Sequence, residues 1–287
     1  MRLILVVALA LVSGTLAGRT LARRGVTAAN ALTGRQSQAS AVFLGVVALG
    51  AILFGASSFD WTPTWFMLYS QEMNGDGLRA LAAVALGLLL GLEWRGRHDP
   101  ARRWQLLGGS VALTLATGFL LYRALPVAGI LGPPAVRDGI VLQTTSYSCA
   151  PAAIATLARF TRLDTGMTER EAARLAGTSR EGTSAYAELR VLRALGLAPG
   201  YRRRLTTDSL PFLGPAILHV NEPILTTTVS HSVALLGVDT AAHTITVGNP
   251  LYGRQVKRFA ELSGYWIGEA VVLGVAFPRV PPIAGQR

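Results

Sequence analysis

Cys149, the only cysteine of the 287-residue chain, stands where a polar loop gives way to an apolar pattern with helical spacing. A thiol at the start of a helix can act as a nucleophile, because the positive end of the helix dipole and a nearby imidazolium both favour the thiolate. His231 is the candidate for that imidazole. An imidazole that acts as a base needs a partner on its second ring nitrogen, and the side-chain oxygen of Asn249 can supply one.

A fourth residue, Gln143, lies in the loop before the cysteine. Its side-chain amide and the backbone N–H of Cys149 could donate hydrogen bonds to the oxyanion of a tetrahedral intermediate. Two other interpretations stay open. Cys149 could be a small buried hydrophobic residue. The three histidines near strands, His219, His231 and His243, could form a zinc site, although their spacing matches no compact ligand pattern. We expect no metal and no organic cofactor.

Helices and strands must position these residues. Apolar spacing, capping residues and glycine stops predict helices over 149–160, 168–176 and 184–195. Four strand patterns follow: PAILHVN, HSVALLGV, HTITVGN and EAVVLGVAF. Helices first and strands later indicate an α+β domain with a mostly antiparallel sheet. If Ser232–Val238 and Thr244–Val247 form a hairpin, His231 lies at its open end opposite Asn249 and Pro250.

These segments, in this order and at this spacing, resemble cysteine-peptidase family 39, the bacteriocin-processing peptidases with a papain-like domain. The resemblance covers most of Ile140–Leu273 and rests on QTTSYSCAPAAIATLARF, GTS…LRALGL, PAILHV and HSVALLGVD…GNPLYG. The family's reaction is cleavage of a peptide bond, typically after a double-glycine leader, through a thioacyl-enzyme intermediate. The resemblance implies that Cys149 is the nucleophile and His231 the general base. It also implies that Asn249 orients the histidine and that Gln143 is the oxyanion-hole donor.

The sequence departs from the family pattern at several points. Ser148 stands where the family usually has an acidic residue, Ala150 where it usually has glycine, and Asn249 where aspartate is more common. Papain-like enzymes also work with asparagine, although the imidazolium is then less strongly stabilised. The chain contains no G-x-x-x-x-G-K-[ST] phosphate loop, so we do not expect it to power transport itself.

The first part of the chain has the composition of a membrane region. The sequence is 51% hydrophobic and only 15% charged, and its net charge of +11 is almost entirely arginine, scattered or beside apolar segments. That distribution is typical of membrane topology signals and not of nucleic-acid binding. About four spanning helices are expected, over residues 3–18, 39–59, 78–94 and 104–122. We interpret the first as an uncleaved anchor, although its small residues would also suit a signal-peptide cleavage site.

Charge between the segments predicts their orientation. Four arginines and no acid follow the first segment, and four more arginines precede the fourth, so both of those loops should be cytoplasmic; they are Arg19, Arg23, Arg24 and Arg35, and Arg95, Arg97, Arg102 and Arg103. The middle loop carries Asp60, Glu72 and Asp76 and no base, so it should lie outside. The fourth helix then runs outward. We therefore expect the domain of residues 135–287 on the extracytoplasmic face of a bacterial cytoplasmic membrane.

Together these patterns predict a transmembrane region over 1–134 followed by a papain-like peptidase domain over 135–287. The expected function is a membrane-anchored cysteine peptidase that processes a secreted or leader-bearing peptide. Its expected partners are the peptide substrate, the lipid bilayer and a peptide exporter, without nucleic acid. Two alternatives stay open. A thiol acyltransferase of the transglutaminase type would pass the acyl group to an amine. A catalytically degenerate domain would only bind peptides for an exporter.

Overall fold

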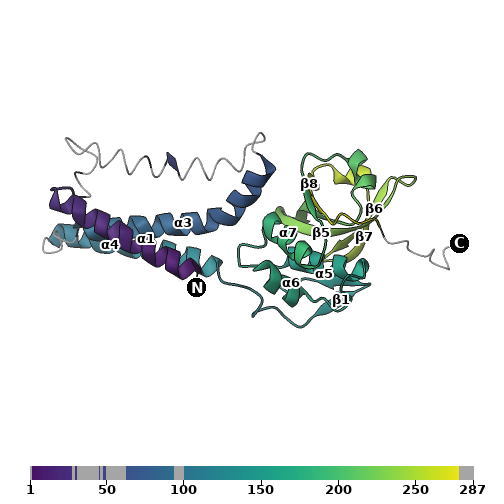
Figure 1. Cartoon of the computed structure of the whole chain (residues 1–287), viewed down its shortest axis with the longest axis horizontal. Helices are drawn as coiled ribbons and strands as arrows, with labels where there is room; N and C mark the ends of the chain where they lie inside the picture. Colours follow the sequence, from purple (N-terminus) through teal and green to yellow (C-terminus); the bar gives the residue numbers. More distant parts are fainter. Residues whose placement is uncertain are drawn as a thin grey trace. The chain divides into compact units, whose positions relative to one another are not determined.

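The structure is a computed structural model that describes residues 2–27, 30, 45, 48–49, 63–93 and 100–277. The chain divides into two compact units, with the boundary between Ala124 and Leu125. The described part of the first unit contains three helices (Figure 1), which are α1 (Arg2–Arg23), α3 (Thr64–Glu93) and α4 (Pro100–Arg123). The domain boundary predicted from the sequence, at residue 134, lies a short way further along the chain.

The described residues contain fewer candidate membrane-spanning helices than the sequence predicts. Within the described residues, one helix is long and apolar enough to cross a membrane, over Leu5–Arg23, and α4 has a shorter apolar stretch over Leu107–Arg123. The expectation of about four spans is therefore not confirmed, and the segment 39–59 lies almost wholly outside the described residues. The expected outer loop before residue 78 is also wrong in part, because α3 begins at Thr64 and carries Asp76 and Arg79 within the helix.

Glycines set the distance between α1 and α3. At four positions an added Cβ would overlap the backbone of the other helix, namely Gly14 and Gly18 on α1 and Gly87 and Gly91 on α3. Each pair has the four-residue spacing that lets two helix backbones approach closely, a packing common between membrane helices. Gly87 faces the backbone of Leu11 and Gly91 faces that of Thr15, so the contacts advance together along both helices. The two helices therefore run parallel.

The second unit starts with a short hairpin of β1 (Ala135–Arg137) and β2 (Ile140–Leu142), followed by α5 (Cys149–Phe160), α6 (Glu169–Ala176) and α7 (Ala185–Ala194). All three predicted helices are confirmed. Thr168 caps α6 by accepting a hydrogen bond from the backbone N–H of Glu171, at 3.2 Å. Ser184 caps α7 by accepting from Ala187 N–H in the same way.

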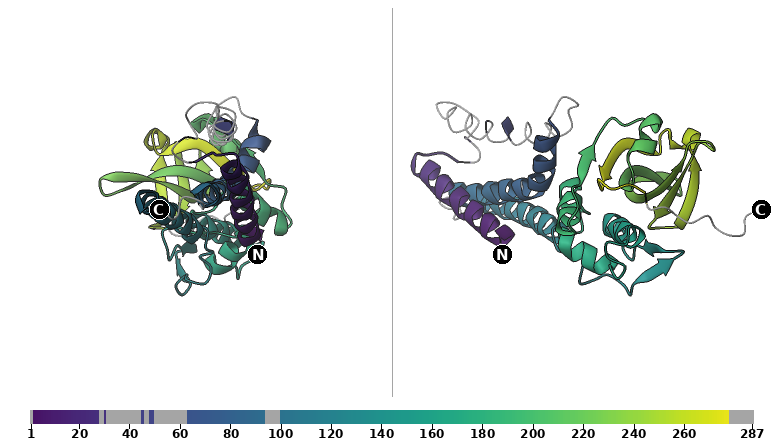
Figure 2. Two further views of the ribbon diagram at one scale, coloured as in Figure 1. Left: turned by 90° about the vertical axis from the view of Figure 1, so that its left-hand side faces the viewer. Right: turned by 45° about the vertical axis from the view of Figure 1, so that its right-hand side comes forward.

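A six-stranded antiparallel sheet completes this unit, with the strand order β3-β8-β4-β5-β6-β7. Its strands are β3 (Gly200–Arg202), β4 (Ala216–Ile224), β5 (Thr227–Asp239), β6 (Thr244–Asn249), β7 (Gly253–Arg258) and β8 (Trp266–Val272), with short 3₁₀ turns at Thr207–Phe212 and Phe259–Leu262. The β4–β5 hairpin extends beyond the rest of the sheet, as the green ribbon of Figure 2 shows. The predicted α+β class with an antiparallel sheet is confirmed.

The ladder between β5 and β6 differs from the predicted hairpin at its open end. Its last pair is Ala234 with Gly248, and an irregularity between Leu235 and Gly237 shifts the register. The prediction that His231 lies directly opposite Asn249 is therefore wrong for the backbone. On its other side β5 pairs with β4 over the full length of β4, and Val220 is the partner of His231.

Apolar side chains of the strands form the core beneath the site. The cluster takes alternate residues from β4, β5 and β6 together with residues near β8, and its fully buried members include Leu218, Val233, Leu235, Ile245 and Val247. The buried face of α5 packs against β5 and β2. Most of that face is alanine, so the helix approaches the sheet closely and its first residue is held at the sheet surface.

Candidate thiol site

Cys149 is the first residue of α5, as the sequence predicts. The residue before it, Ser148, does not cap the helix with its side chain. Its hydroxyl turns back instead and donates to the carbonyl of Thr145, at 3.1 Å. The first backbone N–H groups of α5 are therefore not occupied by the N-cap side chain, and they remain suited to an anion beside the thiol.

The surroundings of Cys149 disfavour its ionisation. Burial raises the pKa of the Cys149 thiol, and the negative charge of Glu188 raises it as well. Hydrogen bonds from Ser232 and from the Ala150 backbone lower the pKa again, but by less. The sequence-based expectation of a thiol pKa lowered by the helix and an imidazolium is therefore wrong for this state. The thiol keeps its proton at neutral pH.

His231 and Asn249 are joined directly. The distance between His231 Nε2 and Asn249 Oδ1 is 3.1 Å, and both residues are buried. The other contacts of the Asn249 side chain determine which atom donates. Asn249 Oδ1 also accepts from the backbone N–H of Leu251, whereas Nδ2 donates to Glu222 and to Gln255. Because Oδ1 can only accept, His231 Nε2 must carry the proton, and the lone pair of the neutral imidazole lies on Nδ1.

His231 is neutral at physiological pH. Burial lowers the pKa of His231, and this effect outweighs the opposing effects of Asn249 and Glu222. Within the described residues no hydrogen bond joins His231 to Cys149. The sulfur meets the sheet at Ser232, the residue next to His231 in the chain. Contacts between catalytic groups are often long in ligand-free enzymes and tighten when substrate binds.

Gln143 lies just after β2, next to the third candidate residue. Its backbone N–H donates to the carbonyl of Pro250, which follows Asn249. Its side-chain Nε2 donates to the Thr145 carbonyl at 2.8 Å, while its Oε1 is buried without a partner in the described part of the chain. A carbonyl can only accept, so this contact fixes the amide orientation. One N–H of Nε2 remains for another acceptor.

The loop between Gln143 and Cys149 is anchored by a buried carboxylate. Glu169, at the start of α6, accepts from the Thr144 backbone N–H at 2.8 Å and from the Thr144 hydroxyl at 2.9 Å. The exposed fraction of Glu169 is only 2%. Because both oxygens of Glu169 bind one residue, the loop has little freedom to move Gln143 away from the cysteine.

A second polar cluster lies on the other face of the β4–β5 ladder. His219 Nε2 is 2.9 Å from Glu188 on α7, and His219 Nδ1 is 3.7 Å from Glu269 on β8. Burial lowers the pKa of His219, but the two carboxylates outweigh it and raise this pKa to about 10. His219 is therefore a partly buried cation between two acids. Within the described residues, no group of three or more His, Cys, Asp or Glu side chains could hold a metal ion.

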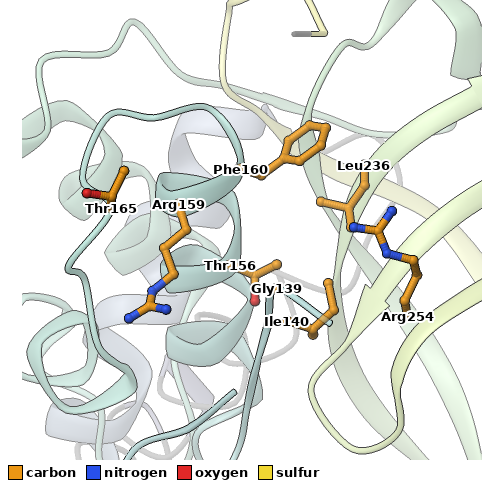
Figure 3. A pocket seen from close by; sticks show the side chains of 8 residues that line it. All are labelled: Gly139, Ile140, Thr156, Arg159, Phe160, Thr165, Leu236 and Arg254. Carbon is orange, nitrogen blue, oxygen red and sulfur yellow. The ribbon is translucent and has the colours of Figure 1, made fainter. Parts of the chain in front are cut away.

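A pocket of about 220 Å³ lies at the other end of α5 (Figure 3). Its lining residues come from β2, α5, β5, β7 and the loops beside them, and are Gly139, Ile140, Thr156, Arg159, Phe160, Thr165, Leu236 and Arg254. Cys149 and Phe160 stand at opposite ends of the helix, roughly 16 Å apart at 1.5 Å per residue. The pocket is therefore separate from the thiol site.

Several residues around the site were missed from the sequence: Glu188, Glu222, Ser232 and Gln255. For Glu222 a signal existed. Leu218, Val220 and Glu222 alternate along β4 on the buried face, so a strand extended beyond Asn221 would have placed an acid inside the protein. For Glu188 on α7 the sequence carries no comparable signal, because its position opposite Cys149 depends on how α7 packs.

Comparison with known proteins gives partial matches. No family model matches the chain. An uncharacterized protein of Methanothermobacter thermautotrophicus is 47% identical over 58 residues, which are 20% of this chain and 39% of that protein. The chain thus spans well under half of the length of this relative.

Among solved structures, the chain is similar to a double glycine motif protease from an AMS/PCAT transporter, solved in complex with the leader peptide. The TM-score is 0.40 with 20% identity, over 49% of this chain and 97% of that chain. The peptidase domain of Streptococcus ComA, a bi-functional ABC transporter involved in a quorum sensing pathway, gives a TM-score of 0.40 with 19% identity, over 47% and 96%. The peptidase domain of Streptococcus mutans ComA gives 0.36 with 19% identity, over 48% and 99%. The case for a function therefore rests on the residues of the chain itself.

Proposed function

We propose that the chain is a cysteine peptidase in which Cys149 is the nucleophile and His231 the general base. The observation that carries this proposal is the bond between His231 Nε2 and Asn249 Oδ1, because it leaves the basic Nδ1 of a neutral imidazole available. Cys149 is the proposed nucleophile because it begins α5; its sulfur contacts Ser232, and in the proposed reaction the thiol and His231 come together when the substrate binds. Gln143 and the backbone N–H of Cys149 are the proposed oxyanion donors.

The protonation states at rest favour a base-assisted attack. Since the thiol pKa is raised and the imidazole pKa is lowered, both groups start neutral. His231 Nδ1 takes the thiol proton as the sulfur bonds to the carbonyl carbon of the substrate and the carbonyl oxygen becomes an oxyanion. The oxyanion then reforms the carbonyl, the C–N bond breaks, and the same proton passes to the leaving amine. Water, deprotonated by His231, releases the acid and restores the thiol.

The proposed substrate is a secreted or leader-bearing peptide, and the proposed setting is a membrane. Two helices of the first unit support the second point with exposed apolar stripes at helical spacing. On α1 the stripe is Leu5, Leu9, Val12 and Leu16, and on α4 it is Leu107, Val111, Leu115 and Phe119. In a bilayer such apolar faces contact lipid chains, so their exposure carries no unfavourable free energy of hydration. We propose that the peptidase unit lies on the extracytoplasmic side, with a peptide exporter as a further partner.

Product analysis tests the proposed activity. Full-length protein in detergent is incubated with a peptide library that includes double-glycine leader sequences, and products are identified by mass spectrometry. We expect new free carboxyl ends with wild-type protein and none with Cys149→Ala or His231→Ala. Adding a primary amine separates hydrolysis from acyl transfer, because transfer produces new amides. If wild-type protein binds peptides but gives the same product profile as Cys149→Ala, the domain is a binding module and the proposal is wrong.

A further inference from the structure

Glu222 is a buried carboxylate beside the candidate catalytic pair. It lies near the end of β4, with an exposed fraction of only 2%. Its Oε2 accepts from Asn249 Nδ2 at 2.9 Å and from the Tyr265 hydroxyl at 2.8 Å. Burying a carboxylate destabilises the fold unless the group is hydrogen-bonded and its charge is paired. The proposed reaction steps do not involve Glu222 directly, so its position needs another explanation.

The contacts of Asn249 show what this carboxylate constrains. A side-chain amide can rotate by half a turn and exchange its oxygen and nitrogen. Gln255 cannot prevent this exchange, because its own amide can turn to match. Glu222 can, because a carboxylate only accepts hydrogen bonds and thus requires the Asn249 nitrogen to face it. The backbone N–H of Leu251 holds the oxygen from the opposite side.

Charge is the second contribution of Glu222. Asn249 is neutral, so it cannot by itself balance the imidazolium that forms during proton transfer. Glu222 is one hydrogen bond further away and carries the negative charge that Asn249 lacks. Each element packed around this network or around the thiol contributes an ionisable group. These groups are Cys149 on α5, Glu188 on α7, Glu222 on β4, Lys257 on β7 and Tyr265 before β8. Among them, Glu222 has the shortest chain of hydrogen bonds to His231.

We propose that Glu222 is a positioning residue that holds Asn249 in the orientation His231 requires and supplies the charge that supports the imidazolium. The arrangement is thus a chain of three hydrogen-bonded groups, His231, Asn249 and Glu222. The catalytic part of this inference rests on the proposed peptidase function, whereas the positioning part concerns the tautomer and the titration of His231 and can be measured without any substrate.

Histidine NMR tests the positioning part. Full-length protein labelled with ¹⁵N-histidine in detergent gives four histidine signals, and the His231→Ala variant identifies the signal of His231. In wild-type protein we expect neutral His231 as the Nε2–H tautomer. Glu222→Gln should introduce a population of the Nδ1–H tautomer. It should also shift the His231 titration to lower pH, because Glu222 raises the pKa of His231.

A matched control separates this effect from loss of a buried acid. Glu269→Gln removes a partly buried carboxylate that, like the buried Glu222, accepts from a tyrosine hydroxyl, here that of Tyr201, but no hydrogen bond joins Glu269 to Asn249 in the described part of the chain. We expect the His231 signal to keep its tautomer and its titration in this variant. Thermal unfolding of both variants shows whether each is folded. A folded Glu222→Gln protein whose His231 tautomer and titration match wild type would overturn the proposal.

An exchange of the two side chains supplies the second test. Asn249→Asp alone places two carboxylates side by side, whereas Asn249→Asp with Glu222→Gln restores one carboxylate and one amide with their hydrogen bond reversed. In the peptide cleavage assay we expect Glu222→Gln to lower kcat by about 10- to 100-fold with little change in KM, the range known for outer partners that orient a metal-binding histidine. The double variant should exceed both single variants, and equal or lower activity would contradict a charge role.

The two tests also separate the two levels of the inference. If no variant and no wild-type preparation cleaves peptides, the proposed function fails, but the NMR result still decides whether Glu222 positions His231. If wild-type protein cleaves peptides and Glu222→Gln is equally active with an unchanged His231 titration, only the role of Glu222 fails.

Discussion

At Cys149, the position at a helix start and the surroundings of the sulfur act in opposite directions. The helix dipole favours a thiolate, but burial and Glu188 favour the thiol, and the net effect is a raised pKa. Because the thiol and His231 are both neutral, the proposed attack resembles that of a serine-type site, in which the base acts only during attack, more than that of a resting thiolate–imidazolium pair.

Alkylation of the single cysteine measures this directly. We expect the reaction of full-length protein with iodoacetamide to stay slow through neutral pH and to accelerate only above about pH 8.5, the ordinary thiol pKa, because the pKa of Cys149 is raised. Glu188→Gln should move the acceleration to lower pH, since a negative charge near the sulfur is removed. Glu171→Gln, an exposed acid on α6, is the control. Fast labelling near pH 5 that is lost in His231→Ala would contradict a neutral pair.

His219 gives a prediction about stability. Its folded-state pKa of about 10 lies above the ordinary histidine value of about 6.5. The charged form is therefore favoured by folding, so its contribution is complete below about pH 6.5 and is lost as the pH rises through about 10. The difference in melting temperature between wild type and His219→Gln should be largest near pH 6 and smallest near pH 10. A difference that does not vary with pH would assign His219 to packing alone.

Among the elements of the second unit, the helices follow from local rules. Thr168 and Ser184 cap α6 and α7 through contacts three residues away, and such contacts are visible in a sequence. Strand β7 was not predicted, because it is an edge strand that alternates exposed and partly exposed residues and has no apolar face. Short strands of three residues, such as β2 and β3, carry no periodicity at all.

The candidate site was predictable in its residue types and less so in its connections. Cys149, His231, Asn249 and Gln143 could be selected because their chemistry is specific and their order matches a known pattern. The hydrogen bond of His231 forms beyond the last pair of the β5–β6 ladder, after a register shift that the sequence does not reveal. The burial of Cys149 and its proximity to Glu188 depend on tertiary packing, and burial first, then the charge of Glu188, reverses the sign of the expected pKa shift.

The pairing of α1 with α3 leads to a prediction for the helical unit. Because backbone of the other helix occupies the space beside Gly14 and Gly87, replacing either by valine should force the helices apart and destabilise the unit by about 1–3 kcal/mol, the usual cost of overpacking. Gly118→Val on α4 is the matched control, since a Cβ there meets no described atom within 4 Å. Thermal unfolding in detergent measures both. Equal melting temperatures for all three variants would contradict the close packing.

The directions of the helices and the distribution of arginines favour the same membrane orientation. α1 runs parallel to α3, while Arg79 on α3 donates to the Leu120 carbonyl of α4 and Leu89 lies against Gly109, so α4 runs antiparallel to α3. The C-terminal end of α1, the C-terminal end of α3 and the start of α4 are therefore at one end of the helical unit. That end carries Arg19 and Arg23 in the last part of α1 and Arg102 and Arg103 in the first turn of α4.

This grouping supports the proposed orientation, because basic residues at one end of a membrane helix bundle favour the cytoplasmic side. We expect alkaline phosphatase fused to the C-terminus to be active and a cytoplasmic reporter at the same position to be inactive. Replacing Arg95, Arg97, Arg102 and Arg103 by glutamine should reduce phosphatase activity, since in the proposed orientation these charges hold the start of α4 in the cytoplasm. Replacing Arg202–Arg204, three arginines of the second unit, by glutamine should leave it unchanged. An inactive phosphatase with an active cytoplasmic reporter would place the thiol site inside the cell, where it would meet a leader peptide before export and not after it.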